Sequence, residues 1–269
     1  MIKSLSFVLK ENFTNLYRIF SISKYELLAE MRDSKLGLFW NFANPAIQIL
    51  TYYFVFGMVF QKKDVNGINY FAWMMGGMVV WFFISPCITN GCNAIYSKVN
   101  IITKMKFPVS ILPATVIMKE LFNHVCLMGV TIIIFACMGI YPNWYWLQLI
   151  YYLFCAIVFS IALSMTTSVL NMLARDTRKM ILACMRLLLY LTPILWDISQ
   201  LNKFPPIKII MKINPIYYIA QGYRDAFFFQ KGILYYWKPM ICFWVVTFIL
   251  LAVGSYMMYK FKHKFIDLI

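Results

Sequence analysis

The stretch WYWLQLIYYLFCAIVFSIALSMTTSVLNMLA, residues 144–174, contains no Asp, Glu, Lys or Arg. A helix rises about 1.5 Å per residue, so about 20 such residues cross a hydrocarbon core of roughly 30 Å. Four further uncharged stretches of sufficient length occupy residues 38–60, 70–90, 121–140 and 239–259. A sixth apolar stretch, residues 180–196, is interrupted by Arg186. The pattern predicts an all-α integral membrane protein with six transmembrane helices.

The composition supports this prediction. Hydrophobic residues make up 62% of the 269 residues, charged residues make up 13%, and the mean hydropathy is +0.70. Soluble domains have roughly 45–50% apolar and about 25% charged residues. A soluble globular domain and a nucleic-acid-binding module are therefore excluded, and membrane lipid is an expected partner.

The motifs of several kinds of chemistry are absent from the sequence. No GxxxxGK[ST] phosphate-binding loop occurs, so this chain holds no cofactor of its own and any ATP and Mg would bind to a partner subunit. The seven cysteines include no CxxC pair, and we expect neither a metal site nor a disulfide. HExxH and GxSxG are missing as well, so no catalytic residues are predicted.

The basic residues of the loops predict the orientation, because Lys and Arg are retained on the cytoplasmic side of a membrane. With six spans the two termini share one side. Fifteen Lys and Arg residues lie in the segments on that side, and eight lie on the other. Both termini are therefore predicted to be cytoplasmic.

Two cytoplasmic segments are candidates for more than simple connection. Residues 21–36, SISKYELLAEMRDSKL, mix apolar and charged residues as in a helix lying along the membrane interface. This helix either anchors the first span or moves as a gate. Residues 91–110 are long for a connector and basic, with a short helix expected near residues 94–103. That loop suits docking of a soluble partner, or it rests on anionic lipid headgroups.

The segment before the last span, residues 199–237, contains two apolar pieces that are too short to cross. Residues 207–213 and 216–229 reach roughly 10 and 21 Å as helices, and Pro205, Pro206 and Pro215 separate them. We expect two re-entrant helices on the outer side, lining or closing an aqueous path. The alternative is a helical hairpin that rests on lipid.

Four ionisable residues lie inside the predicted spans, where charge is costly and often functional. They are Lys119, Glu120, His124 and Arg186. Glu120 and His124 are four residues apart on one helix face, so they are expected to pair with each other or with Arg186. A contact with an anionic substrate is the alternative.

Four blocks of sequence, in this order, carry a resemblance to a known family. They are MRDSKLGLFWNFANP (31–45), KMKFPVSILP (104–113), NMLARDTRK (171–179) leading to YLTPILW (190–196), and NPIYYIAQGYRDAF (214–227). The chain resembles the membrane subunit of type-2 ABC exporters, and within them the branch that exports polyprenol-linked teichoic acid, O-antigen or capsule.

The resemblance implies a homodimer of six-span permeases in the bacterial cytoplasmic membrane, bound to two cytoplasmic ATPase subunits. It implies a cytoplasmic N-terminus with a gate helix (1–37), a transmembrane domain (38–260) and a cytoplasmic tail (261–269). Residues 91–110 would form the ATPase-coupling loop, and 199–237 the outer re-entrant segment. The first and fifth spans would line the channel.

The site residues that these segments imply fall into four groups. Residues of the ATPase-coupling surface would be Tyr96, Lys98, Asn100, Lys104, Lys106, Arg175 and Asp176. Residues of the gate and substrate entrance would be Arg32, Lys35, Trp40 and Arg186. Aromatic residues lining the channel would be Tyr52, Tyr53, Phe54 and Tyr190. Residues of the outer re-entrant pair would be Asn214, Pro215, Tyr218, Tyr223 and Arg224.

The charge of the outer segment bears on the exported glycopolymer. Arg224, Lys208, Lys212 and Lys231 would suit an anionic chain, so wall teichoic acid is the favoured polymer. An O-antigen or capsule permease and a type-2 ABC permease for drugs or small lipids are the alternatives. A membrane enzyme acting on polyprenol-linked sugars is a remote one.

Overall fold

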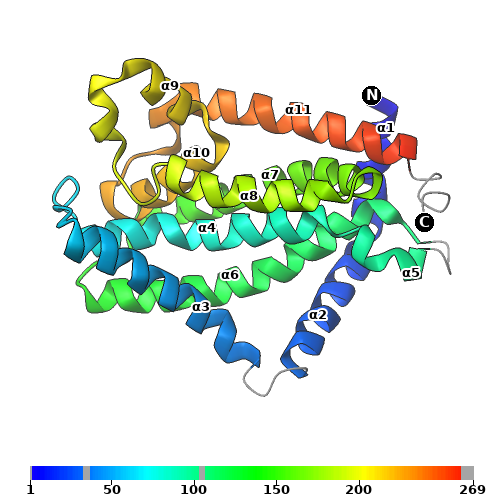
Figure 1. Ribbon diagram of the computed structural model, residues 1–269, viewed down its shortest axis with the longest axis horizontal. Helices are drawn as coiled ribbons and strands as arrows, with labels where there is room; N and C mark the ends of the chain where they lie inside the picture. The colour runs from blue at the N-terminus through cyan, green and yellow to red at the C-terminus, as the bar shows by residue number, and fades with distance from the viewer. Residues whose placement is uncertain (1, 33–36, 103–106, 262–269) are drawn as a thin grey trace.

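The computed structural model describes residues 2–32, 37–102 and 107–261, and these fold into a helical bundle (Figure 1). Lys35, Lys104 and Lys106 of the predicted site lie outside the described residues. The α-helices are α1 (Ile2–Thr14), α2 (Leu16–Arg32), α3 (Gly37–Tyr52), α4 (Tyr70–Cys92), α5 (Val99–Ile102), α6 (Leu112–Cys137), α7 (Gln148–Leu173), α8 (Asp176–Leu191), α9 (Pro205–Ile213), α10 (Pro215–Arg224) and α11 (Trp237–Phe261). Shorter helical turns are η1 (Tyr53–Val59), η2 (Tyr96–Lys98), η3 (Val109–Ile111), η4 (Trp144–Leu147), η5 (Ile198–Lys203), η6 (Asp225–Phe229) and η7 (Ile233–Tyr236).

Within the described residues, five helical segments are long and apolar enough to cross a membrane, and each overlaps one of the five uncharged stretches. The sixth stretch behaves differently. Its helix α8 has 16 residues, about 24 Å, and ends at Leu191 because Thr192 is extended and precedes Pro193. α8 lies beside α4 in the bundle (Figure 1), but it is shorter than the roughly 20 residues that cross a hydrocarbon core. Six crossings therefore remain a prediction.

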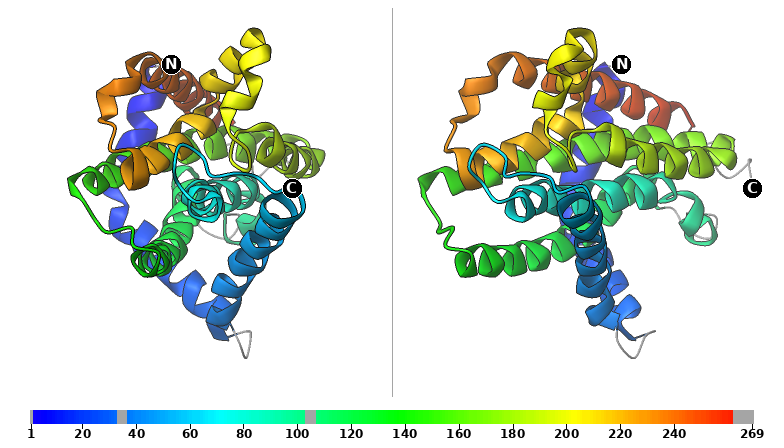
Figure 2. Two further views of the ribbon diagram at one scale, coloured as in Figure 1. Left: turned by 90° about the vertical axis from the view of Figure 1, so that its left-hand side faces the viewer. Right: turned by 60° about the vertical axis from the view of Figure 1, so that its left-hand side comes forward.

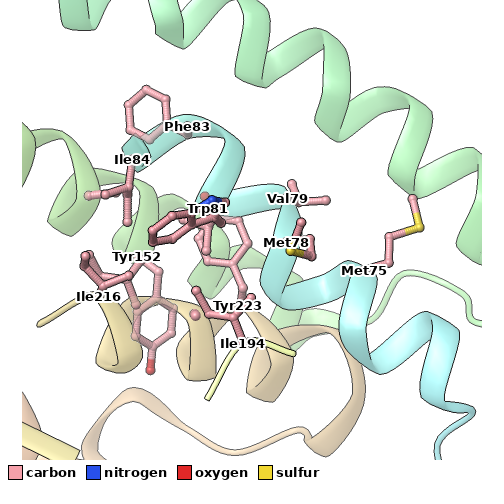
Figure 3. Close-up of a cluster of buried hydrophobic side chains, with 14 of the residues drawn as sticks. Met75, Met78, Val79, Trp81, Phe83, Ile84, Tyr152, Ile194, Ile216 and Tyr223 are labelled. Carbon is pink, nitrogen blue, oxygen red and sulfur yellow. The ribbon is translucent and has the colours of Figure 1, made fainter. Parts of the chain in front are cut away.

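Helix α4 forms the centre of the bundle. Its apolar residues are distributed around the whole helix. Of the 18 consecutive residues that form its most apolar part, 78% are buried. It contacts α6, α7, α8 and α10. Figure 3 shows Met78 and Val79 of α4 among the cluster that also includes Tyr152 of α7 and Tyr223 of α10. The remaining helices are thus positioned around α4.

The N-terminal region forms two helices rather than one. Residues 21–32 of the helix predicted at 21–36 form the second half of α2, which already begins at Leu16, and α1 precedes it; residues 33–36 lie outside the described residues. Both cross the bundle instead of running along it (Figure 2). The Ser23 hydroxyl on α2 donates to the Thr115 carbonyl at 2.7 Å, and Phe20 packs edge-on against Phe122 of α6 at 5.6 Å. α2 is thereby fixed to the bundle, whereas its place at a membrane interface stays a prediction.

The bundle has two distinct ends. Helix α1 and the end of α11 lie at one end together with α5, which we call the terminal end (Figure 1). The opposite end carries α9 and α10. Asn214 caps α10 by accepting from the Ile216 N–H at 2.9 Å, and Pro215 occupies the first helical position. The two predicted short helices are present, and their insertion into a membrane remains a prediction.

Candidate functional site

The first candidate feature is the separation of α3 and η1 from the core. Of the 18 consecutive residues that form the most apolar part of this span, only 6% are buried. Several side-chain contacts connect it to the bundle. Ile49 is buried in the main hydrophobic cluster, the Asn41 amide donates to Asn123 at 3.1 Å, Tyr53 packs against Phe71, and Tyr52 meets Tyr190 of α8. α3 therefore lies on the bundle with most of its surface uncovered.

The uncovered span carries polar side chains that the sequence analysis missed. Asn41, Asn44 and Gln48 are three and four residues apart, so they share one side of α3, and we call them the polar stripe. Asn44 and Gln48 are exposed. Their spacing within an uncharged stretch is a signal that the sequence already contained. Amide groups in a span are functional candidates, because hydrocarbon cannot hydrogen-bond to them.

Helix α8 contributes the second part of the candidate site. Its residues Met185 and Leu189 are buried, while Arg186, Leu187 and Tyr190 are exposed. The rings of Tyr190 and Tyr52 stand perpendicular at 6.4 Å, which joins α8 to α3. We call the exposed surfaces of these two helices the α3–α8 surface. Arg186 lies roughly 15 Å along α8 from Asp176, within an otherwise apolar segment.

The four predicted channel aromatics occupy different surroundings. Tyr52 and Tyr190 contact each other, whereas Tyr53 turns toward α4, with its ring 5.0 Å from Phe71. Phe54 is exposed. The structure thus brings two of the four together.

The predicted entrance residues lie on separate elements. Arg32 ends α2 and is exposed, and Trp40 is exposed in the first turn of α3 with its ring against Phe39 at 5.7 Å. Arg186 lies on α8. The described entrance residues therefore come from α2, α3 and α8.

The terminal end unites two of the predicted coupling residues. Tyr96 is exposed, and the Arg175 guanidinium lies 5.3 Å from the centre of its ring. This contact joins η2 to the connection between α7 and α8. Asn100 is exposed on the neighbouring α5, and Asp176 forms an exposed ion pair with Lys179 at 3.3 Å. These residues form one accessible polar surface.

Two ion pairs connect this end to α2. Lys98 pairs with Glu26 and donates to the Thr115 hydroxyl at 3.3 Å. Lys119 pairs with Glu30 at 2.6 Å. Glu26 and Glu30 are four residues apart, so both point to the same side of α2. Lys98 is thus engaged within the chain, although it was predicted as a docking residue.

The predicted pairing of Glu120 with His124 is wrong. Among the described residues, Glu120 accepts from Asn90 at 3.1 Å and from Asn123 at 3.3 Å. The His124 Nε2 atom lies 3.1 Å from the Tyr223 hydroxyl, and Arg186 is exposed on α8. Each of these two buried side chains thus has a partner on another helix, and Glu120 also lies 3.6 Å from the Lys119 ammonium on its own helix.

The residues of the outer pair anchor α10 inside the bundle. Asn214 donates to the Thr192 hydroxyl at 3.0 Å, and Tyr218 packs against Tyr152 and Phe243. The expectation that Arg224 contributes to an exposed basic surface is wrong, since its side chain is fully buried. Gly77 of α4 leaves room for the guanidinium, because a Cβ there would lie 2.5 Å from Arg224 Nη2.

The chain is similar in sequence to known proteins over most of its length. A family model described as ABC-2 type transporter matches residues 17–228, which run from α2 into η6. The chain is similar to an O-antigen export system permease protein of Myxococcus xanthus, with 24% identity over 249 residues, 93% of this chain and 94% of that protein. Two proteins of the same description from Klebsiella pneumoniae are each 27% identical over 250 residues, 92% of this chain and 93% of theirs. The matched region contains α3, α8, the Tyr96–Arg175 contact and α10.

Proposed function

The chain belongs to the ABC-2 type transporter family, and we propose that it is the permease of an ATP-driven exporter of a lipid-linked, O-antigen-type surface polysaccharide. Permeases of this family work with a cytoplasmic ATPase subunit. The relatives are named for O-antigen export, so they support an O-antigen or capsule permease better than the wall teichoic acid permease that the sequence favoured. A bacterial cytoplasmic membrane location with cytoplasmic termini is part of the proposal.

The observation that carries the proposal is the uncovered α3. Of the 18 residues in its most apolar part, just 6% are buried, whereas the corresponding share in α4 is 78%. The polar stripe lies on this uncovered helix. Lipid tails offer no hydrogen bonds to Asn44 and Gln48. A second copy of the chain would cover α3 and α8 and leave the polar stripe facing a shared path. The amides would then exchange hydrogen bonds with passing sugar hydroxyls.

The terminal end supports a route for coupling. Two ATPase subunits would dock on the surface containing Tyr96, Asn100 and Arg175. The ion pairs Glu26–Lys98 and Glu30–Lys119 would transmit a displacement of that surface to α2. Because α3 follows α2 in the chain, the movement would change how α3 lies on α4 and α8.

The cationic residues near the α3–α8 surface suit a polyprenol diphosphate head. Arg186 is exposed within an apolar surrounding, where an arginine and a phosphate attract more strongly than in water. Arg32 and Lys35 would receive the head at the membrane surface, and Trp40 would lie beside it.

Depletion of this chain in its host tests the proposed function. We expect the surface polysaccharide to disappear while its lipid-linked form accumulates in the cells, because synthesis continues without export. Immunoblotting of intact cells and of extracted lipid-linked glycan measures both, and a tagged permease should copurify with an ATPase. Normal surface polysaccharide combined with impaired efflux of small apolar compounds would instead identify a drug or lipid exporter. A purified chain that cleaves polyprenol-linked sugar without nucleotide would identify an enzyme.

Replacement of the polar stripe should slow export directly. The double variant Asn44→Leu with Gln48→Leu is expected to lower the export rate by about tenfold, equivalent to about 1.4 kcal/mol in the barrier, because sugar hydroxyls lose their partners. Pulse-labelled polysaccharide appearing at the cell surface is the measurement. The control is Ile47→Leu with Leu50→Ile, exposed neighbours on the same helix that stay apolar. Equal rates in the two double variants would contradict a role of the polar stripe.

A further inference from the structure

A separate cavity lies at the end of the bundle opposite the terminal end. It is an open hollow with a volume of about 630 Å³, lined mainly by η5, α9, α10, η7 and the start of α11, with further residues from α4 and α7. Figure 1 shows α9 and α10 beside this part of α11. Small-molecule sites usually have volumes of about 300–1,000 Å³. Neither the polar stripe nor Arg186 lines the cavity, so it is distinct from the α3–α8 surface.

The walls of this cavity carry an excess of positive charge. Lys208 and Lys212 come from one side of α9, Lys231 precedes η7, and Lys238 lies at the start of α11. None of the four forms an ion pair with a residue that the structure describes. Asp197 is the one carboxylate among the lining residues, and it already accepts from the Ser199 N–H at 3.2 Å and the Ser199 hydroxyl at 2.7 Å. A concave, basic surface of this kind favours an anion.

Aromatic rings lie beside these lysines. The Lys231 ammonium donates to the Tyr236 hydroxyl at 3.2 Å and lies 4.9 Å from the centre of the Tyr235 ring. Lys238 lies 5.4 Å from the centre of the Trp237 ring. Tyr235 and Trp237 are 63% and 53% exposed, so their ring faces are accessible. Such faces bind the C–H groups of a carbon skeleton, which a bare inorganic anion lacks.

We propose that this cavity binds a phosphate-bearing sugar or polyol, with its phosphate on the lysines and its carbon skeleton on the aromatic rings. Lys208 and Lys212 would pair with the phosphate, and Trp237 would contact the skeleton. Gln221 also lines the cavity, and its amide donates to the Asp225 carboxylate at 3.0 Å. Two sources supply this chemistry: a phosphorylated unit of a glycan and the polar head of an anionic glycerophospholipid. The inference concerns binding alone and does not depend on what the permease exports.

Isothermal titration calorimetry of the purified full-length permease with glucose 1-phosphate tests whether the cavity binds this ligand. We expect saturable binding that Lys208→Ala with Lys212→Ala weakens by at least about tenfold, because two charged partners of the phosphate are lost. The matched control, Lys62→Ala with Lys63→Ala, removes the same charge at the same end from residues that do not line the cavity. Its affinity should stay within about twofold. Absence of saturable binding, or an equal loss in both double variants, would overturn the proposal.

A second variant separates the two parts of the site without removing charge. Trp237→Ala should weaken glucose 1-phosphate by about fivefold and leave the weaker binding of inorganic phosphate unchanged, since only the sugar uses the ring. Parallel losses for both ligands would show that the ring does not contact a carbon skeleton, which contradicts the proposed ligand class. Thermal unfolding of each variant checks that the fold is retained.

Nanodiscs distinguish the two sources. The permease is placed in phosphatidylcholine with or without phosphatidylglycerol, and glucose 1-phosphate is titrated into each. If phosphatidylglycerol competes with the sugar phosphate in the unmodified chain, and the Lys208 and Lys212 replacements abolish that competition, the lipid head is the natural occupant. Equal affinity in both nanodiscs assigns the cavity to a glycan phosphate. Competition that survives the replacements would place the lipid elsewhere and count against the cavity as a shared phosphate site.

Discussion

Arg224→Met should destabilise the protein by about 3–5 kcal/mol, because three backbone carbonyls lose their charged donor and a buried acceptor left unsatisfied costs about 1–3 kcal/mol. The Arg224 guanidinium donates to the carbonyl oxygens of Trp73 at 3.2 Å, Pro193 at 2.8 Å and Ile194 at 2.5 Å. It also lies 3.6 Å from the centre of the Trp73 ring. Methionine fills a similar volume but donates nothing, so the carbonyls of the α8–η5 connection lose their buried donor.

Thermal unfolding of the detergent-solubilised protein, together with its monodisperse fraction on gel filtration, measures this effect. Lys203→Met, an exposed basic residue at the same end, serves as the control and should unfold like the unmodified chain. Arg224→Lys should recover stability only in part, because one ammonium cannot reproduce the planar fork of a guanidinium. Full recovery by lysine, or an unfolding temperature unchanged by methionine, would show that the carbonyl contacts contribute little.

The sequence predicts the helical bundle well, for a simple physical reason. An uncharged stretch of 20 or more residues has few alternatives to a membrane helix, and each of the five such stretches overlaps a long apolar helix. The prediction is less accurate for the stretch 180–196. Apolar composition alone does not show that Pro193 ends α8 after 16 residues. Backbone geometry, rather than hydropathy, limits that helix.

The partners of the ionisable residues were harder to predict, because they come from distant parts of the chain. Glu120 and His124 lie one helical turn apart, yet the structure pairs them with Asn90 and Tyr223. Arg224 reaches a carbonyl 151 residues away. Sequence spacing reports neighbours on one helix, whereas these contacts depend on how separate helices pack.

The polar stripe is the opposite case, in which the signal was present in the sequence. Asn41, Asn44 and Gln48 have the spacing of one helix side within a span that carries no charge. What the sequence lacked was the position of α3 outside the core. Polar residues of a buried span would pair inside the bundle, as Asn90 does, whereas those of an uncovered span need another partner.

Reversal of the ion pair between α2 and η2 should uncouple the permease. In Glu26→Lys, two ammonium groups face each other where Lys98 and Glu26 now pair, and α2 loses an attractive contact with the terminal end. We expect export to fall by at least about tenfold, because this pair links the Tyr96–Arg175 surface to α2. A tenfold loss of rate corresponds to a barrier raised by about 1.4 kcal/mol. ATP hydrolysis by the purified complex should persist, since the ATPase subunits are unchanged.

The double variant Glu26→Lys with Lys98→Glu decides whether the pair itself transmits the movement. It restores the attraction with the charges exchanged, so export should return to within about threefold of the unmodified chain. Recovery is expected to be incomplete because the hydrogen bond from Lys98 to the Thr115 hydroxyl is lost. Lys24→Glu, a charge reversal at an exposed position of α2, should leave export unchanged. Export by the double variant no better than by Glu26→Lys would mean that α2 receives its displacement elsewhere. The ion pair of Lys119 with Glu30, one turn further along α2, is then the next connection to test.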